Sequence, residues 1–129
     1  MRSTPLVLLV DDDEDIRDVV RDVLESAGYA VELASDGAMA LARLERPPFP
    51  SLIVLDLMMP VVDGVTFVRE LESRASPCGI PILFSTALPR TVVSTLDLPA
   101  YCALVRKPFD LDDFLDKVAT HAAPAVAQP

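Results

Sequence analysis

Short apolar runs alternate along the chain with stretches of helical periodicity, and this alternation constrains the fold more than any other feature. Each run is rich in branched side chains and is short enough to form a strand covered on both faces. The runs are Leu6–Val10, Ala30–Ala34, Leu52–Leu55, Ile80–Phe84 and Ala103–Val105. The second run is less apolar than the others, as an edge strand would be. Strands that alternate with helices through short connections predict an α/β domain with a parallel sheet and right-handed crossovers.

Five helices are expected around this sheet. The first is the clearest, because its apolar residues recur at helical spacing on one face, at Ile16, Val19, Val20, Val23, Leu24 and Ala27. Glycine and proline residues mark the helix ends. The first helix ends at Gly28, and the second is capped by Asp36 and ends at Pro47. The third is expected at Val65–Arg74, and the fourth is a short or frayed helix within residues 88–100. The fifth is capped by Asp110.

Length and composition predict one domain over residues 1–121, followed by a disordered Ala/Pro-rich tail at residues 122–129. No apolar run approaches the roughly 20 residues that a spanning helix needs, and no secretory signal is present. We therefore expect a soluble cytoplasmic protein in which Cys78 and Cys102, which lack metal-ligand spacing, are reduced. The formal charge of −9 argues against nucleic acid and anionic membranes as direct partners.

Polar residues follow the predicted strands at the points where the apolar runs end. Asp11 and Asp12 follow the first strand, Asp56 the third, Thr86 the fourth and Lys107 the fifth. One interpretation is purely structural: Asp56 accepts hydrogen bonds from loop amides, and the acidic residues after the first strand cap a helix. However, ligands of open α/β sheets bind at the carboxyl ends of the strands. The complete set at strand ends therefore favours a site.

The chemistry of this set points to a metal ion and a phosphate. Carboxylates that lie close together repel one another unless a cation neutralises them. Hard oxygen ligands without histidine or thiolate favour Mg²⁺, which usually keeps waters and phosphate oxygens as its other ligands. Lys107 and Thr86 suit phosphoryl oxygens, and Asp56 could form an aspartyl phosphate.

Four motifs resemble the receiver domains of two-component response regulators, and the resemblance covers about Leu6 to Ala119. They are VDDDED at Val10–Asp15, LDLMMPVVDG at Leu55–Gly64, STA at Ser85–Ala87 and VRKPF at Val105–Phe109. The resemblance implies a flavodoxin-like, doubly wound five-stranded sheet of order 2-1-3-4-5 with five helices.

The same resemblance implies roles for individual residues. Asp56 would be the phosphoacceptor. Mg²⁺ would be held by Asp11, Asp12, Asp56 and the backbone carbonyl of Met58, and Thr86 and Lys107 would contact the phosphoryl group. The donor would be a phosphohistidine on a sensor histidine kinase or a histidine phosphotransfer protein, and the receiver would catalyse the transfer to itself. The protein would be a monomer or a weak dimer.

Two departures from the family concern the output of the signal. Leu104 stands three residues before Lys107, where the family often has an aromatic residue that rotates inward on phosphorylation. The segment before the last strand is irregular and bracketed by prolines. Because 129 residues leave no room for an effector domain, we expect an unknown partner protein to receive the signal.

Three alternatives differ from this interpretation in the sequence features that they require. A receiver-like module that binds a partner without phosphorylation would not need the intact acidic set and the lysine. A haloacid-dehalogenase-like phosphatase would carry its DxD nucleophile on the first strand, whereas Asp56 follows the third. A flavin-binding protein of this fold would have a Gly/Ser/Thr-rich loop after the first strand, where this chain is acidic.

Overall fold

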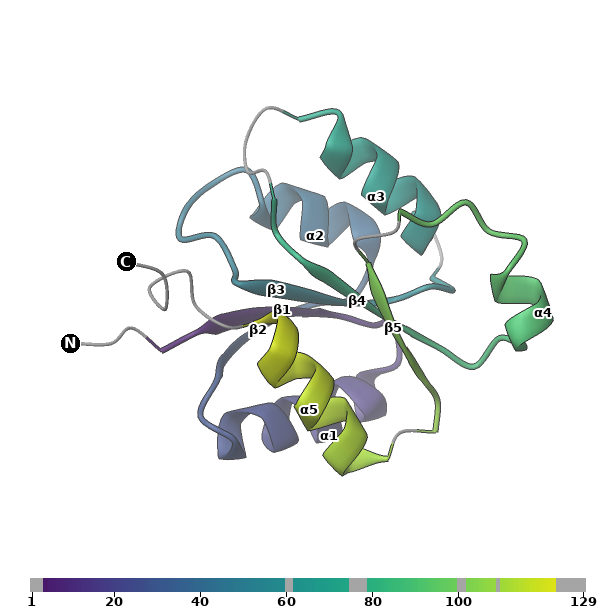
Figure 1. Ribbon diagram of the computed structural model, residues 1–129. Helices are drawn as coiled ribbons and strands as arrows, with labels where there is room; N and C mark the ends of the chain where they lie inside the picture. Colours follow the sequence, from purple (N-terminus) through teal and green to yellow (C-terminus); the bar gives the residue numbers. More distant parts are fainter. Residues whose placement is uncertain (1–3, 60–61, 75–78, 100–101, 109, 123–129) are drawn as a thin grey trace.

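The computed structural model describes residues 4–59, 62–74, 79–99, 102–108 and 110–122. A five-stranded parallel sheet lies between two layers of helices (Figure 1). The strand order is β2-β1-β3-β4-β5, so the predicted fold class and strand order are confirmed. The elements are β1 (Leu6–Val10), α1 (Glu14–Ser26), β2 (Ala30–Ala34), α2 (Gly37–Arg43), β3 (Leu52–Asp56), α3 (Gly64–Glu72), β4 (Ile82–Thr86), α4 (Arg90–Val93), β5 (Ala103–Arg106) and α5 (Leu111–His121).

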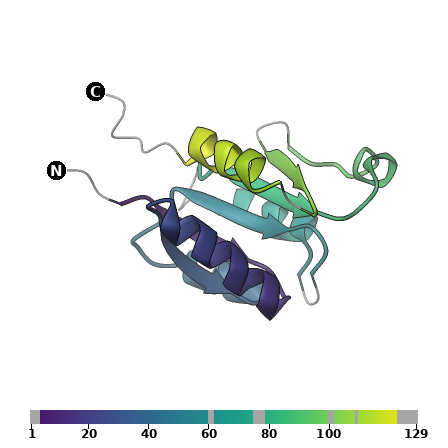
Figure 2. The same cartoon turned by 90° about the horizontal axis from the view of Figure 1, so that it is seen from below.

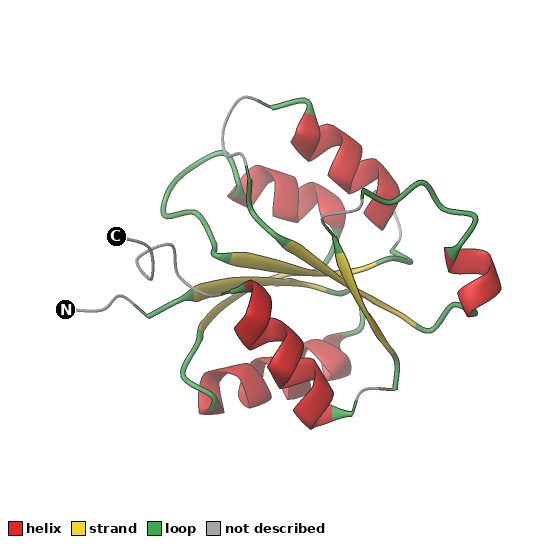
Figure 3. Cartoon of the chain, viewed as in Figure 1, coloured by secondary structure: helices red, strands yellow, loops and turns green. Residues whose placement is uncertain are grey.

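The sheet separates two apolar cores. On one face α1 and α5 pack against the sheet, and Figure 2 shows this face from below. Helices α2 and α3 lie on the other face, above the sheet in Figure 3, and the segment that contains α4 packs against the same core. All residues of β3 and β4 are buried, because these strands have neighbours on both sides and helices on both faces.

Aspartates begin four of the helices. The side chains of Asp13, Asp36, Asp63 and Asp110 each accept a hydrogen bond from a backbone N–H in the first turn, which satisfies groups that the helix leaves unpaired. At the other end of α1, Gly28 has a φ of 101°, a conformation that favours glycine and ends the helix. The acidic residues of the first loop therefore have partly structural roles.

Strand β4 begins two residues later than predicted. The sequence pattern placed it at Ile80–Phe84, but Pro81 has no N–H and contributes only its carbonyl, which accepts a bond from Ile53 N at 3.0 Å. The ladder therefore runs over Ile82–Thr86, and Thr86 is its last residue rather than the start of the loop.

Other boundaries differ by one or two residues. Helix α3 starts earlier and ends earlier than the predicted Val65–Arg74, because Asp63 caps it and Ser73 closes it. The expected short helix within residues 88–100 is α4, which has four residues.

The folded part of the chain extends one residue further than predicted, to Ala122, which directly follows α5. Ala122, which we assigned to the tail, is buried in the core beneath α1 and α5, because it continues the apolar face of α5. The rest of the predicted tail lies outside the described residues. Within the described part of the chain, no helix is both long and apolar enough to cross a membrane.

The structure describes one of the two cysteines. Cys102 is a free thiol, and its burial, together with the charge of Glu72, raises its pKa to about 11. Cys78 lies outside the described residues.

Candidate active site

The carboxyl ends of β1 and β3 bring two buried carboxylates together. Asp56 is the last residue of β3 and is 8% exposed, and Asp11, directly after β1, is 3% exposed. Asp12 is next to them on the exposed side of the loop. One oxygen from each of these three aspartates lies within 4.8 Å of the others. The structure therefore gathers the predicted acidic residues in one place.

Lys107 joins the two buried carboxylates. It directly follows β5, and its Nζ lies 2.9 Å from Asp11 Oδ2 and 3.2 Å from Asp56 Oδ2. Its backbone N–H donates to the carbonyl of Thr86 at 2.8 Å, which fixes the start of the loop. One ammonium thus compensates the two buried carboxylates at the ends of β1 and β3. Buried charges need such a partner.

Backbone amides orient the remaining carboxylate oxygens. Asp13 N donates to Asp11 Oδ1, and Met58 N donates to Asp56 Oδ1, each at 3.0 Å. Each oxygen of an ionised carboxylate has a second lone pair, so both groups could still bind a cation. The carboxylates are therefore held in place before any ligand arrives.

The site shifts the ionisation of its own members. Burial is the main reason that the pKa of Asp56 is raised, and the nearby charge of Asp11 adds to this, while Met58 N–H and Lys107 oppose it. Burial alone would lower the pKa of Lys107, but its bonds to Asp11 and the charges of both carboxylates outweigh that effect and raise it. Lys107 is consequently charged at neutral pH.

Thr86 lies at the same edge of the sheet, beside the acidic residues. Asp56 pairs in register with Ser85, so Thr86 stands one residue further along the neighbouring strand. The Thr86 side chain is buried, and its Oγ1 accepts a hydrogen bond from Leu88 N at 2.9 Å. The hydroxyl therefore ties the end of β4 to the loop that leads to α4.

Met58 contributes its amide to the site, while its side chain is 60% exposed. The use of its carbonyl as a metal ligand stays a prediction.

Sequence reasoning missed one cation beside the acidic loop. Arg17, in the first part of α1, donates from Nη1 to the backbone carbonyl of Asp11 at 2.8 Å. A basic residue shortly after a run of acidic residues was the available signal. The bond holds the acidic loop against α1.

The donor set was tested for its fit to a metal ion. The three clustered aspartates offer only hard oxygen ligands, and the one histidine of the sequence, His121, lies at the far end of α5. Such a set fits Mg²⁺ better than it fits zinc or copper.

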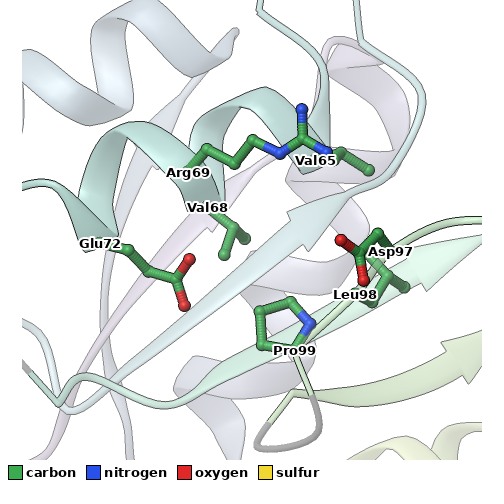
Figure 4. Close-up of a pocket in the computed structure, with 7 residues that line it drawn as sticks. All are labelled: Val65, Val68, Arg69, Glu72, Asp97, Leu98 and Pro99. Carbon is green, nitrogen blue, oxygen red and sulfur yellow. The ribbon is translucent and has the colours of Figure 1, made fainter.

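Two surface hollows differ in their relation to this site. One is an apolar groove along α1 that reaches Lys107, and Ile16, Val19, Val20, Ala87 and Pro108 supply its apolar lining. The other lies between α3 and the chain at Asp97–Pro99, where Arg69 and Glu72 face it from the helix (Figure 4). Only the first adjoins the acidic cluster.

Comparison with known proteins places the chain in a family. Residues 7–119 match the response regulator receiver domain. The DNA-binding dual master transcriptional regulator RpaA of Synechocystis sp. is 40% identical over 116 residues, which cover 88% of this chain and 47% of that protein. The response regulator receiver protein CpdR of Brucella abortus is 35% identical over 115 residues, covering 87% of this chain and 92% of that protein.

A solved structure agrees with these relatives. The receiver domain of sensor histidine kinase PA1611 from Pseudomonas aeruginosa, with a magnesium ion coordinated in its active-site cleft, matches with a TM-score of 0.84 and 27% identity. The match covers 95% of this chain and 100% of that one. The chain belongs to the response regulator receiver domain family and is a receiver domain of a two-component system.

Family membership sets the general function. Receiver domains bind Mg²⁺ at their acidic active site and interact with histidine kinases or phosphotransfer proteins. The chain spans about half the length of RpaA.

Proposed function

We propose that this chain is the phosphoacceptor of a two-component system or phosphorelay and that Asp56 receives the phosphoryl group from a phosphohistidine of a partner protein. The single observation that carries this proposal is the position of Lys107 Nζ, in contact with both Asp56 and Asp11 inside a cluster of three carboxylates. A structural aspartate at a strand end would need neither the second carboxylate nor the shared ammonium.

The residues divide the work of transfer. A carboxylate oxygen of Asp56 forms the new O–P bond as the P–N bond to the donor imidazole breaks, and the electron pair of that bond stays on the imidazole nitrogen. Lys107 pairs with a phosphoryl oxygen, and the Thr86 hydroxyl donates its proton in a hydrogen bond to another. Asp11, Asp12, Asp56 and the Met58 carbonyl would hold Mg²⁺, which neutralises charge on the phosphoryl oxygens when it is bound.

The apolar groove beside Lys107 supports a protein as the phosphodonor. Val19 is 59% exposed on α1, although it is a large apolar residue, and it lines the groove with Ile16 and Pro108. The part of the partner that surrounds its phosphohistidine would cover this groove when the histidine reaches Asp56, because the groove extends to Lys107. The partner would be a sensor histidine kinase or a histidine phosphotransfer protein.

Four further features belong to the same proposal. The receiver domain extends to Ala122, and it acts in the cytoplasm as a monomer or weak dimer. Its output is contact with another protein rather than with nucleic acid or membrane, consistent with the formal charge of −9.

The test is intact-mass analysis after incubation with a small acyl phosphate and Mg²⁺. The wild type should gain the mass of one phosphoryl group. Asp36→Asn, which changes an aspartate that caps α2 outside the site, should gain it as well. Asp56→Asn should gain none, and an undiminished adduct in that variant would refute the proposal.

A further inference from the structure

Arg106 carries a buried hydrogen-bond donor that is not used. Among the residues that the structure describes, its Nη1 is the buried side-chain nitrogen that has no hydrogen-bond partner. Leaving a buried donor unpaired is costly, and native proteins rarely do so without a reason. The unpaired donor could therefore gain a hydrogen-bond acceptor in another conformational state of the protein.

The position of Arg106 relates this donor to the phosphorylation site. Arg106 is the last residue of β5 and pairs in register with Thr86, the last residue of β4. Two residues earlier, Leu104 packs into the core on the face of α2 and α3. Because side chains alternate along a strand, Arg106 lies on that same face.

The chain between β4 and β5 reaches the same face, and we call residues 87–99 the α4 segment. The segment is connected to Thr86 Oγ1 by the amide of Leu88 at 2.9 Å. It packs through Val93, Leu96 and Leu98 against the same core cluster that Leu104 contacts. The α4 segment thus touches both the site, through Thr86, and the face on which Arg106 lies.

The α4 segment is weakly held. Helix α4 has four residues, no side-chain bond caps its start, and none of its residues is buried. Figure 1 shows α4 standing away from the sheet. A pocket of about 260 Å³ separates α3 from Asp97–Pro99 (Figure 4). A segment with so few buried contacts and free space beside it can shift at low cost.

We propose that Arg106 couples the phosphoryl site to the α4 segment. The coupling rests on the proposed function of Asp56. When the Thr86 hydroxyl turns to a phosphoryl oxygen, its bond with Leu88 N is lost and the α4 segment moves. A backbone carbonyl of the segment then accepts a hydrogen bond from Arg106 Nη1. The bond exists only in the phosphorylated state, so it favours the shifted position of the segment.

This coupling suits the residues that the chain has. Leu104 has no polar atom with which to respond to phosphate, whereas Arg106 has a rigid guanidinium with several donors. Arg106 can therefore form a hydrogen bond on the face of β5 where Leu104 cannot.

The test measures amide hydrogen exchange across residues 87–99, before and after phosphorylation, with intact mass recording the phosphorylated fraction. Arg106→Met keeps a long apolar stem without donors, and Arg106→Lys keeps the charge on a shorter group. Arg90→Met is the control, because Arg90 is an exposed arginine of α4.

Wild type and Arg90→Met should show exchange in this segment that changes by about fivefold on phosphorylation, the shift that one hydrogen bond can supply. Both Arg106 variants should accept phosphate normally and lose most of that change. Unphosphorylated Arg106→Met should melt no lower than the wild type, because it loses only an unpaired donor.

Three results would overturn the coupling. A response of wild-type size in phosphorylated Arg106→Met and Arg106→Lys would show that the arginine is not involved. A lower melting temperature of unphosphorylated Arg106→Met would show that the guanidinium already stabilises the free state. Failure of the wild type to take up phosphate would instead refute the function of Asp56, and the coupling with it.

Discussion

Among the single residues of the site, Lys107 offsets the negative charge of the carboxylates. Its ammonium is shared by Asp11 and Asp56, and Asp12 adds a third carboxylate on the exposed side of the loop. One cation for three clustered carboxylates leaves net negative charge, which attracts a divalent ion.

Removal of Asp12 should therefore weaken Mg²⁺ binding. We expect Asp12→Ala to lower the affinity by roughly tenfold or more, because Mg²⁺ is held by few protein carboxylates. Asp15→Ala, which removes an exposed acidic residue of the first turn of α1, is the matched control. Titration calorimetry would measure both, and equal affinities would mean that Asp12 serves the loop rather than the metal.

The lifetime of the phosphorylated form also depends on single residues. Met58 and Leu88 stand two residues beyond Asp56 and Thr86, and neither side chain can orient a water for attack on phosphorus. We predict slower loss of phosphate from the wild type than from the Met58→Asn, Leu88→Glu double variant.

A time course of intact mass would measure this difference. A tenfold difference in rate corresponds to about 1.4 kcal/mol of barrier, so modest shielding is detectable. Longer retention of phosphate by the double variant would contradict the shielding.

Among the secondary-structure elements, α1 should select the phosphodonor through the apolar groove that runs along it. We predict that Val19→Lys slows transfer from a phosphohistidine protein, because a charge enters the apolar groove, while labelling by a small acyl phosphate is unchanged. Val92→Lys places the same charge on an exposed apolar residue of α4, outside the groove. If both variants slow transfer equally, the groove has no special role.

Arg43 fastens the end of α2 to the edge strand. Its guanidinium bonds the Glu32 carboxylate and the carbonyls of Arg46 and Pro48. The hydrogen bond from Arg43 is the main reason that the pKa of Glu32 lies below its ordinary value of 4.5. A lowered pKa in the folded state means that the pair stabilises the fold above pH 4.5 and loses this effect as the pH falls through the folded pKa.

The pair therefore predicts a pH-dependent difference in stability. Wild type should be more stable than Glu32→Gln at pH 6.5, by less than about 1 kcal/mol because the pair is partly exposed. The difference should shrink as the pH falls below 4.5. Urea unfolding at several pH values would measure it, and in an Arg43→Met background the pH dependence should become smaller, because Arg43 is the main cause of the lowered pKa of Glu32. A difference that grew on acidification would contradict the assignment.

The elements also show what the sequence could predict. Periodicity and caps located all ten elements, but the start of β4 depended on Pro81, whose carbonyl is used while its nitrogen is not. The unpaired donor of Arg106 could not be read from the sequence, because it depends on packing between distant elements. For Arg17, the sequence offered only its place shortly after the acidic run, which does not predict a bond to a particular carbonyl.

The whole molecule places its chemistry at one edge of the sheet. Parallel strands bring their carboxyl ends together, so residues far apart in sequence, such as Asp11 and Lys107, could be predicted to meet. The topology accounts for the grouping of the acidic residues and the lysine, while the exact bonds of Lys107 emerge only in the folded chain.

Asp56 should accept phosphate in a reaction that needs Mg²⁺. The most direct measurement labels the protein with a small acyl phosphate, with Mg²⁺ or with excess chelator, reduces the acyl phosphate with borohydride, and maps the modified peptide by mass spectrometry. Reduction is expected at Asp56 alone, and only with Mg²⁺. A modified residue other than Asp56, or equal modification in the presence of chelator, would contradict it.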